Sequence, residues 1–176
     1  MQAGVLRQLS LQGSTTYDDI SSSKEGDSSY RPKSARPNKD DWPTLVVEAG
    51  YSQSLRDLRL KANRWLSNSA NSVKFVVIIL IGRSAPYRIL VEKWEPASTV
   101  QRRTRQNSNP STALRPTKTQ MIRILKDATT NAITVNGAPL RLSFEKIFLR
   151  PPQPPEPANF DFTDQDLTYI ATKIWD

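Results

Sequence analysis

The middle of the chain alternates between strand-like and helix-like patterns of apolar residues. Residues 73–81 (VKFVVIILI) are apolar apart from one Lys, and such a run predicts a central strand that is covered on both faces. Residues 44–49 (TLVVEA) predict a second strand, and residues 87–94 (YRILVEKW) predict an antiparallel neighbour of the central strand. These segments indicate an α/β fold with a mixed central sheet.

Residues 54–66 predict a packed helix after the strand at residues 44–49. Apolar side chains recur there at helical spacing and form a core-facing stripe made of Leu55, Leu58, Ala62, Trp65 and Leu66. Ser54, followed by Asp57 three residues later, is a capping-box-like signal for the start of a helix.

The remaining elements divide the chain into three parts. Three further strands are predicted, at residues 121–125, 132–135 and 139–144. A terminal helix opens at Thr163, after a Pro-rich spacer (LRPPQPPEP). We expect an N-terminal segment at residues 1–12, a core at residues 13–150, and the spacer with its helix at residues 151–176.

The composition narrows the chemistry that is open to this protein. The 176 residues include no His and no Cys, which excludes Ser-His-Asp and Cys-His triads, thiolate zinc sites and disulfides. Carboxylates, Lys, Tyr or a hard metal ion remain as candidates. The longest apolar run is too short to cross a membrane, and the first residues lack the apolar stretch of a secretory signal. We therefore expect an intracellular protein, cytoplasmic or nuclear, with no membrane partner.

Positive charge is concentrated in one segment. Lys and Arg number 25 against 17 Asp and Glu, a formal charge of +8, and such a balance is typical of nucleic-acid-binding proteins. Residues 96–126 contain seven basic residues and no acidic one. We expect a basic loop at residues 96–118 that neutralises DNA or RNA phosphates through Arg102, Arg103, Arg105, Arg115 and Lys118. The same composition is equally typical of a flexible, solvated insertion.

Two acidic residues are candidates for metal chemistry. Glu48 lies inside the apolar run of a predicted strand, where a charge is costly unless it is paired or binds a cation. Asp27 lies 21 residues earlier in a polar segment. Two carboxylates that converge from adjacent strands would make an oxygen-rich site for Mg²⁺ or Mn²⁺. The alternative is an ion pair between Glu48 and a nearby Lys or Arg.

A long segment of the chain resembles a known nuclease core. Residues 27–81 (DSSYRPKSARPNKDDWPTLVVEAGYSQSLRDLRLKANRWLSNSANSVKFVVIILI) resemble the PD-(D/E)XK nuclease superfamily, and more closely fungal proteins with restriction-endonuclease-like names. Further similar segments are ILVEKWE, NGAPLRLSFEKIFLRPPQPPE and FTDQDLTYIATKIWD, so the resemblance covers most of residues 13–176. It implies a restriction-endonuclease-like core in which Asp27 and Glu48 hold Mg²⁺ or Mn²⁺, with the Ala49 carbonyl as a further ligand. Because superfamily members usually have a helix before the first core strand and only about a dozen residues precede Gly13, the resemblance also implies that the N-terminal segment is truncated.

The sequence departs from the superfamily motif at two positions. Gly50 stands where the motif has a Lys two residues after the second acid, and Gly26 stands where a Pro precedes the first acid. Some members of the superfamily have the Lys on the following helix, which here points to Lys61, with Gln53 at the helix entrance as a second substitute. The alternative for Lys61 is a solvated surface side chain.

Three functions are consistent with these observations. The first is metal-dependent phosphodiester hydrolysis of nucleic acid by Asp27 and Glu48, with Lys61 or Gln53 positioning water and with activity weakened by Gly50. The second is a catalytically inactive nucleic-acid-binding or protein-interaction module on the same fold. The third is a simple RNA-binding protein whose salt-sensitive binding depends on neither acid.

Overall fold

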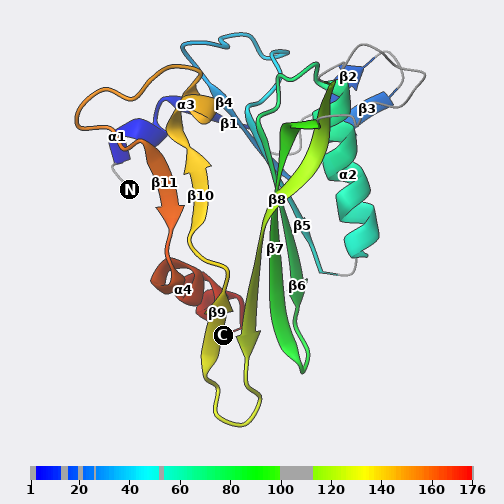
Figure 1. Ribbon diagram of the computed structural model, residues 1–176, viewed down its shortest axis with the longest axis vertical. Coiled ribbons are helices and arrows are strands. Elements are labelled where there is room, and N and C mark those ends of the chain that lie inside the picture. Colours follow the sequence, from blue (N-terminus) through cyan, green and yellow to red (C-terminus); the bar gives the residue numbers. More distant parts are fainter. Residues whose placement is uncertain are drawn as a thin grey trace.

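The computed structural model describes residues 3–12, 16–19, 22–25, 27–51, 54–99 and 113–175. Its centre is a seven-stranded sheet with the order β1-β4-β5-β6-β7-β8-β9 (Figure 1). These strands are β1 (Leu9–Gln12), β4 (Ser28–Pro32), β5 (Leu45–Gly50), β6 (Phe75–Gly82), β7 (Tyr87–Thr99), β8 (Ala113–Lys126) and β9 (Ile133–Asn136). Two further two-stranded sheets are formed by β2 (Thr16–Asp19) with β3 (Ser22–Glu25) and by β10 (Leu140–Ser143) with β11 (Asn159–Phe162). The helices of the described residues are α1 (Ala3–Leu6), α2 (Leu55–Asn68), α3 (Phe144–Phe148) and α4 (Asp164–Trp175).

The α/β class and the mixed central sheet predicted from the sequence are confirmed. Strands β5 and β6 run parallel and are joined by α2, whereas the other neighbouring strands of this sheet run antiparallel. Figure 1 shows α2 on one side of the central sheet, with α4 and the β10–β11 pair on the other. This arrangement explains the apolar sequence of β6, because both of its faces are covered.

Helix α2 forms at its predicted position. The Oγ of Ser54 accepts a hydrogen bond from the backbone N–H of Asp57 at 3.1 Å, which satisfies one of the free donors of the first turn. The predicted stripe packs on the sheet and buries Leu58, Ala62, Trp65 and Leu66.

Helix α4 begins after Thr163, whose Oγ1 accepts a hydrogen bond from the backbone N–H of Asp166 at 3.3 Å. Its Leu167 is buried, whereas Ile170 is 42% exposed. Ile170 lines an apolar cavity of about 380 Å³ between α4, the β10–β11 pair and the central sheet. The apolar stripe of α4 is therefore only partly packed.

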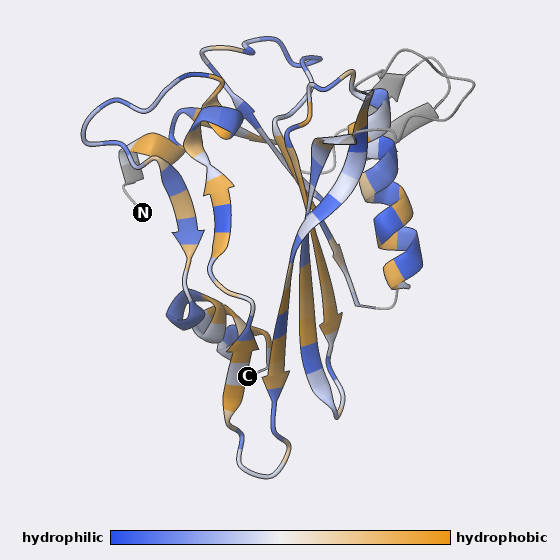
Figure 2. Ribbon diagram, viewed as in Figure 1, coloured by the Kyte–Doolittle hydropathy of each residue, from blue (hydrophilic) through white to orange (hydrophobic). Residues whose placement is uncertain are grey.

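The basic loop predicted at residues 96–118 is wrong at both ends, since β7 and β8 extend into this segment. Residues 100–112 lie outside the described residues. Strand β6 pairs with residues 88–94 of β7, so the outer part of β7 pairs with β8 in a two-stranded ribbon where Pro96 faces Pro116. Pro is tolerated there because one edge of each strand needs no hydrogen-bond donor. The ribbon is markedly less apolar than the inner parts of β6, β7 and β8 (Figure 2).

The sheet also begins earlier than the boundary expected at residue 13. Strand β1 belongs to the segment at residues 1–12 and pairs antiparallel with β4 at the edge of the sheet. Its four residues alternate between apolar and polar, but a run of four residues is a weak strand signal. In the structure Leu11 is 64% exposed. The strand predicted at residues 139–144 forms as β10, but it pairs with β11 and not with the central sheet.

Candidate functional site

Glu48 is fully buried on the face of the sheet that α2 covers. It is the fourth residue of β5, and its side chain has 0% exposure. Trp65 Nε1 donates to Glu48 Oε1 at 2.7 Å, and Lys61 Nζ donates to Glu48 Oε2 at 3.0 Å. Both donors come from α2, one turn apart, so the helix packing that buries the carboxylate also supplies its partners. Trp42 packs edge-on against Trp65, with ring centroids 5.9 Å apart, and so helps to fix the indole that binds Glu48.

Asp27 lies next to Glu48, immediately before β4. Strands β4 and β5 are antiparallel with Ser28 opposite Val47, and this register brings Asp27 level with Glu48. The Asp27 Oδ2 accepts a hydrogen bond from the backbone N–H of Ala49 at 2.6 Å. Asp27 is exposed whereas Glu48 is not, so the two acids have contrasting access to solvent.

Burial destabilises the ionised form of Glu48. Burial raises the pKa of Glu48 above its ordinary value, the hydrogen bonds from Trp65 and Lys61 act in the opposite direction, and the nearby charge of Asp27 raises the pKa further. A carboxyl group in this situation gains from any additional positive charge that approaches it.

The structure brings together three of the residues that the sequence identified, Asp27, Glu48 and Lys61. Lys61 is not simply a solvated surface side chain, because its ammonium contacts the buried carboxylate while 35% of the side chain stays exposed. The same contact is the ion pair between Glu48 and a Lys or Arg that was the alternative to a metal site. For Ala49, the contact seen is made by its amide to Asp27. Gln53 lies outside the described residues.

Asp27 and Glu48 are the candidate ligands for a hard divalent ion. They occupy facing positions in the β4–β5 register, and Mg²⁺ is commonly held by only one or two carboxylates, with water and substrate phosphate completing its coordination. Each carboxylate oxygen of Glu48 accepts one hydrogen bond here and has a second lone pair. Within the described ranges, no three acidic side chains gather into a group that could hold a metal ion. A metal at this place would therefore rest on Asp27 and Glu48 alone.

Glu92 is a second fully buried acid that the sequence analysis missed. Its carboxylate accepts two hydrogen bonds from Arg59, one of them from Nε at 3.0 Å, and a third from Trp94 Nε1 at 3.0 Å. Lys118 Nζ lies 3.4 Å from Glu92 Oε1. Burial opposes the charge of Glu92, but these partners outweigh it and lower its pKa.

Glu92 and Glu48 occupy one row across the sheet. Both align with Ile78 of β6, from β7 and β5 respectively, so their side chains share the face under α2. With strands ~4.8 Å apart, their Cα atoms are separated by about 10 Å. The signal that could have identified Glu92 is the same as for Glu48, a single acid inside an apolar strand, in YRILVEKW.

The predicted nucleic-acid-binding residues are only partly described. Arg102, Arg103 and Arg105 lie outside the described residues. Arg115 and Lys118 are exposed on β8, and Lys118 is engaged with Glu92.

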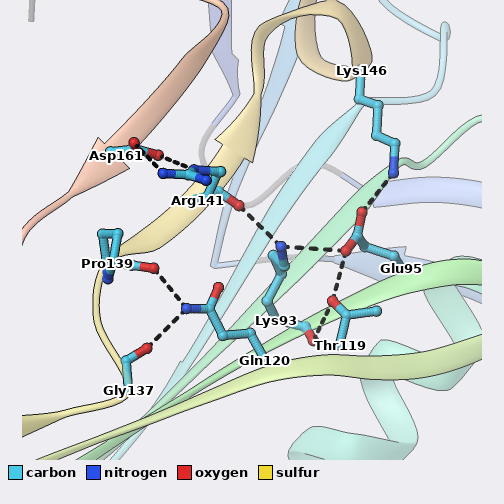
Figure 3. Close-up of polar contacts among 9 residues, drawn as sticks. All are labelled: Lys93, Glu95, Thr119, Gln120, Gly137, Pro139, Arg141, Lys146 and Asp161. Carbon is cyan, nitrogen blue, oxygen red and sulfur yellow. Dashed lines mark hydrogen bonds and ion pairs between the residues drawn. The ribbon is translucent and has the colours of Figure 1, made fainter.

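A further polar cluster joins the sheet to the layer opposite α2 (Figure 3). Glu95 on β7 accepts hydrogen bonds from Lys146 Nζ at 2.7 Å and from Thr119 Oγ1 at 2.6 Å. Lys93 Nζ lies 3.3 Å from the Glu95 carboxylate and donates to the Arg141 backbone oxygen of β10 at 3.0 Å. Burial opposes the charge of Glu95, but these contacts lower its pKa. The cluster attaches α3 and β10 to the sheet and has no feature of a reactive site.

Comparison of the chain with protein-family models, curated proteins and solved structures found no match in any of the three. No helix in the described part of the chain is long and apolar enough to span a membrane.

Proposed function

We propose that this chain is a metal-dependent phosphodiesterase of the PD-(D/E)XK nuclease type, with a restriction-endonuclease-like core. The observation that supports it is the contact of Lys61, on the helix after β5, with Glu48, which lies beside Asp27. An acid immediately before β4, a second acid on the adjacent strand β5 and a Lys on the following helix agree with the arrangement that the sequence resemblance implies when Gly50 replaces the motif Lys. The parallel β5–α2–β6 unit in a mixed sheet agrees with the core that the resemblance implies.

Each residue of the site has a separate task. Asp27 and Glu48 would hold Mg²⁺ or Mn²⁺, which supplies activation of water and neutralisation of phosphate charge when bound. Lys61 provides a fixed positive charge beside Glu48, placed to stabilise an anionic phosphate and to orient a water molecule. Trp65 fixes one oxygen of Glu48, which restricts the carboxylate to one orientation.

A cleavage assay on purified protein tests this proposal. Labelled single-stranded and duplex DNA and RNA are incubated with Mg²⁺ or Mn²⁺, using wild type, Asp27→Asn, Glu48→Gln and Lys61→Met. We expect all three substitutions to lower the rate, by about 10²–10³-fold for Lys61→Met, because it removes one electrostatic stabiliser. Asp40→Asn is the control, since Asp40 is an exposed acid of the same polar segment. Cleavage that persists in excess EDTA, or that is undiminished in Glu48→Gln, would refute the assignment.

A second candidate is a nucleic-acid-binding module that has lost catalysis. One observation favours it, since both oxygens of Glu48 already accept protein hydrogen bonds and the side chain has no exposed surface. This candidate predicts that wild-type protein binds oligonucleotides but cleaves none of the substrates with either metal ion.

A further inference from the structure

A groove lies on the α2 side of the sheet, at the start of α2. Its volume is about 580 Å³. Its polar lining includes Tyr51, Ser54, Arg88 and Arg123, and its apolar lining includes Leu80 and Leu90. The groove is therefore bounded by Tyr51, which directly follows β5, the strand of Glu48.

The sheet register places this groove beside the buried acids. Leu80, Leu90 and Arg123 are aligned across β6, β7 and β8. This row is two residues from the row of Ile78 and Glu92, so its side chains point to the same face and lie about 7 Å further along the strands.

The two arginines of the groove have no partner in the described part of the chain. Arg88 and Arg123 are exposed, and neither makes a hydrogen bond or an ion pair with any described residue. The acids of this face, Glu48 and Glu92, are buried and already paired with cations. Asp57, in the first turn of α2, is hydrogen-bonded to the neutral Ser54 and keeps its own charge. Arg88 and Arg123 therefore carry two positive charges at the groove that no ion pair with a described residue neutralises.

The positive charge extends along β8 beyond the groove. Lys118 is aligned with Trp94, on the same face as Glu92, and 35% of its side chain is exposed. The five residue steps from Lys118 to Arg123 span about 17 Å of strand. A single phosphate is too small to contact both ends, whereas a chain of phosphates can.

We propose that this groove binds the sugar-phosphate backbone of a nucleic-acid strand and leads it toward Glu48 and Lys61. Arg88 and Arg123 contact successive phosphates, Lys118 extends the track, and Leu80 with Leu90 provides an apolar floor for sugars or bases. The inference rests on the proposed function for its substrate class. It shares Lys118 with the sequence-based expectation, which placed binding in residues 96–118, but Arg88 and Arg123 lie outside that segment.

The test is a measurement of equilibrium binding in the absence of divalent metal, so that the probe is not cleaved during the measurement. Fluorescence anisotropy with labelled single-stranded and duplex DNA and RNA, over a series of salt concentrations, compares wild type with the double variant Arg88→Gln/Arg123→Gln. Each lost phosphate contact lowers the slope of log affinity against log salt by about 1, so we expect a decrease of about 2 and a weaker affinity. The matched control is Arg64→Gln/Lys173→Gln, which removes the same charge from exposed positions of α2 and α4.

The outcomes separate this inference from the proposed function. A lower slope in the double variant and not in the control supports the groove, and the better-bound probe identifies the form of nucleic acid. Three results would overturn it. The first is an unchanged slope and affinity in the double variant, and the second is no binding by wild type. The third is a lower slope only when Arg102, Arg103 and Arg105 are neutralised together. Loss of cleavage in Glu48→Gln with the groove variant binding normally would refute the groove and leave the proposed function intact.

Discussion

Glu48 and Glu92 are both fully buried glutamates under α2, yet the same substitution is expected to affect them in opposite ways. At Glu92, burial is outweighed by two bonds from Arg59 and one from Trp94, and the pKa is lowered. At Glu48, burial dominates over Trp65 and Lys61, and the pKa is raised. Compared with a free Glu side chain in water, the ionised form of Glu92 is stabilised by its surroundings and the ionised form of Glu48 is destabilised.

Replacement of each Glu by Gln removes the charge and keeps the shape. Glu92→Gln loses charge-assisted hydrogen bonds, worth ~1.5–3 kcal/mol each when buried, but Arg59 and Lys118 can hydrate, so we expect a loss of about 2 kcal/mol at pH 7. Glu48→Gln can keep the bond from Trp65, while Lys61 turns to solvent and the desolvation cost disappears. We expect its free energy of unfolding to stay within about 1 kcal/mol of wild type or to exceed it.

Urea unfolding at several pH values measures both effects. The lowered pKa of Glu92 gives stability that is present above the ordinary value of 4.5 and is lost as the pH falls through the folded-state pKa, so the deficit of Glu92→Gln should shrink below pH 4.5. The raised pKa of Glu48 has the opposite sign, since wild type gains stability relative to Glu48→Gln as the pH falls through that pKa. A loss above about 2 kcal/mol in Glu48→Gln, or none in Glu92→Gln, would refute this reasoning.

Two further predictions concern the stability of the fold, both measured by urea unfolding. Ser54→Ala should lower the free energy of unfolding by about 1 kcal/mol, because it removes the cap of α2. Ser67→Ala, at an exposed position of the same helix, is the control and should change stability little. Equal effects of the two substitutions would contradict the capping role. Gly137→Ala should be destabilising by at least about 1 kcal/mol, because Gly137 has φ +95° and an added Cβ would lie only 2.4 Å from the Met121 oxygen. Gly4→Ala is the control, since an added Cβ there meets nothing within 4 Å. If Gly137→Ala left the free energy of unfolding unchanged, the turn would relax around the new side chain and the prediction would be wrong.

The elements with a local signal were predictable from the sequence. Ser54 and Asp57 specify the start of α2, and the apolar run of β6 predicts a strand covered on both faces; the structure shows both. The acid at Glu48 was identified because a charge in an apolar strand needs a partner.

The features that depend on pairing with distant strands were not predictable. The outer parts of β7 and β8 form a ribbon only because they pair with each other, and their own sequence, with Pro96 and Pro116, reads as a loop. Strand β1 has the same origin, since its pairing with β4 and not its apolar pattern defines it. The partner of Glu48 also needed the structure, because spacing alone does not distinguish Lys61 as a site residue from a surface Lys.

The central claim is that Asp27 and Glu48 form one divalent-metal site beside Lys61, and calorimetric titration with Mn²⁺ tests it most directly. Wild type and the control Asp40→Asn should each bind about one Mn²⁺ per chain, at a site where carboxylates and water are the ligands. Asp27→Asn and Glu48→Gln should each weaken that binding by at least about tenfold, since each removes a ligand charge. Absence of Mn²⁺ binding by wild type, or equal binding by all four proteins, would contradict the account.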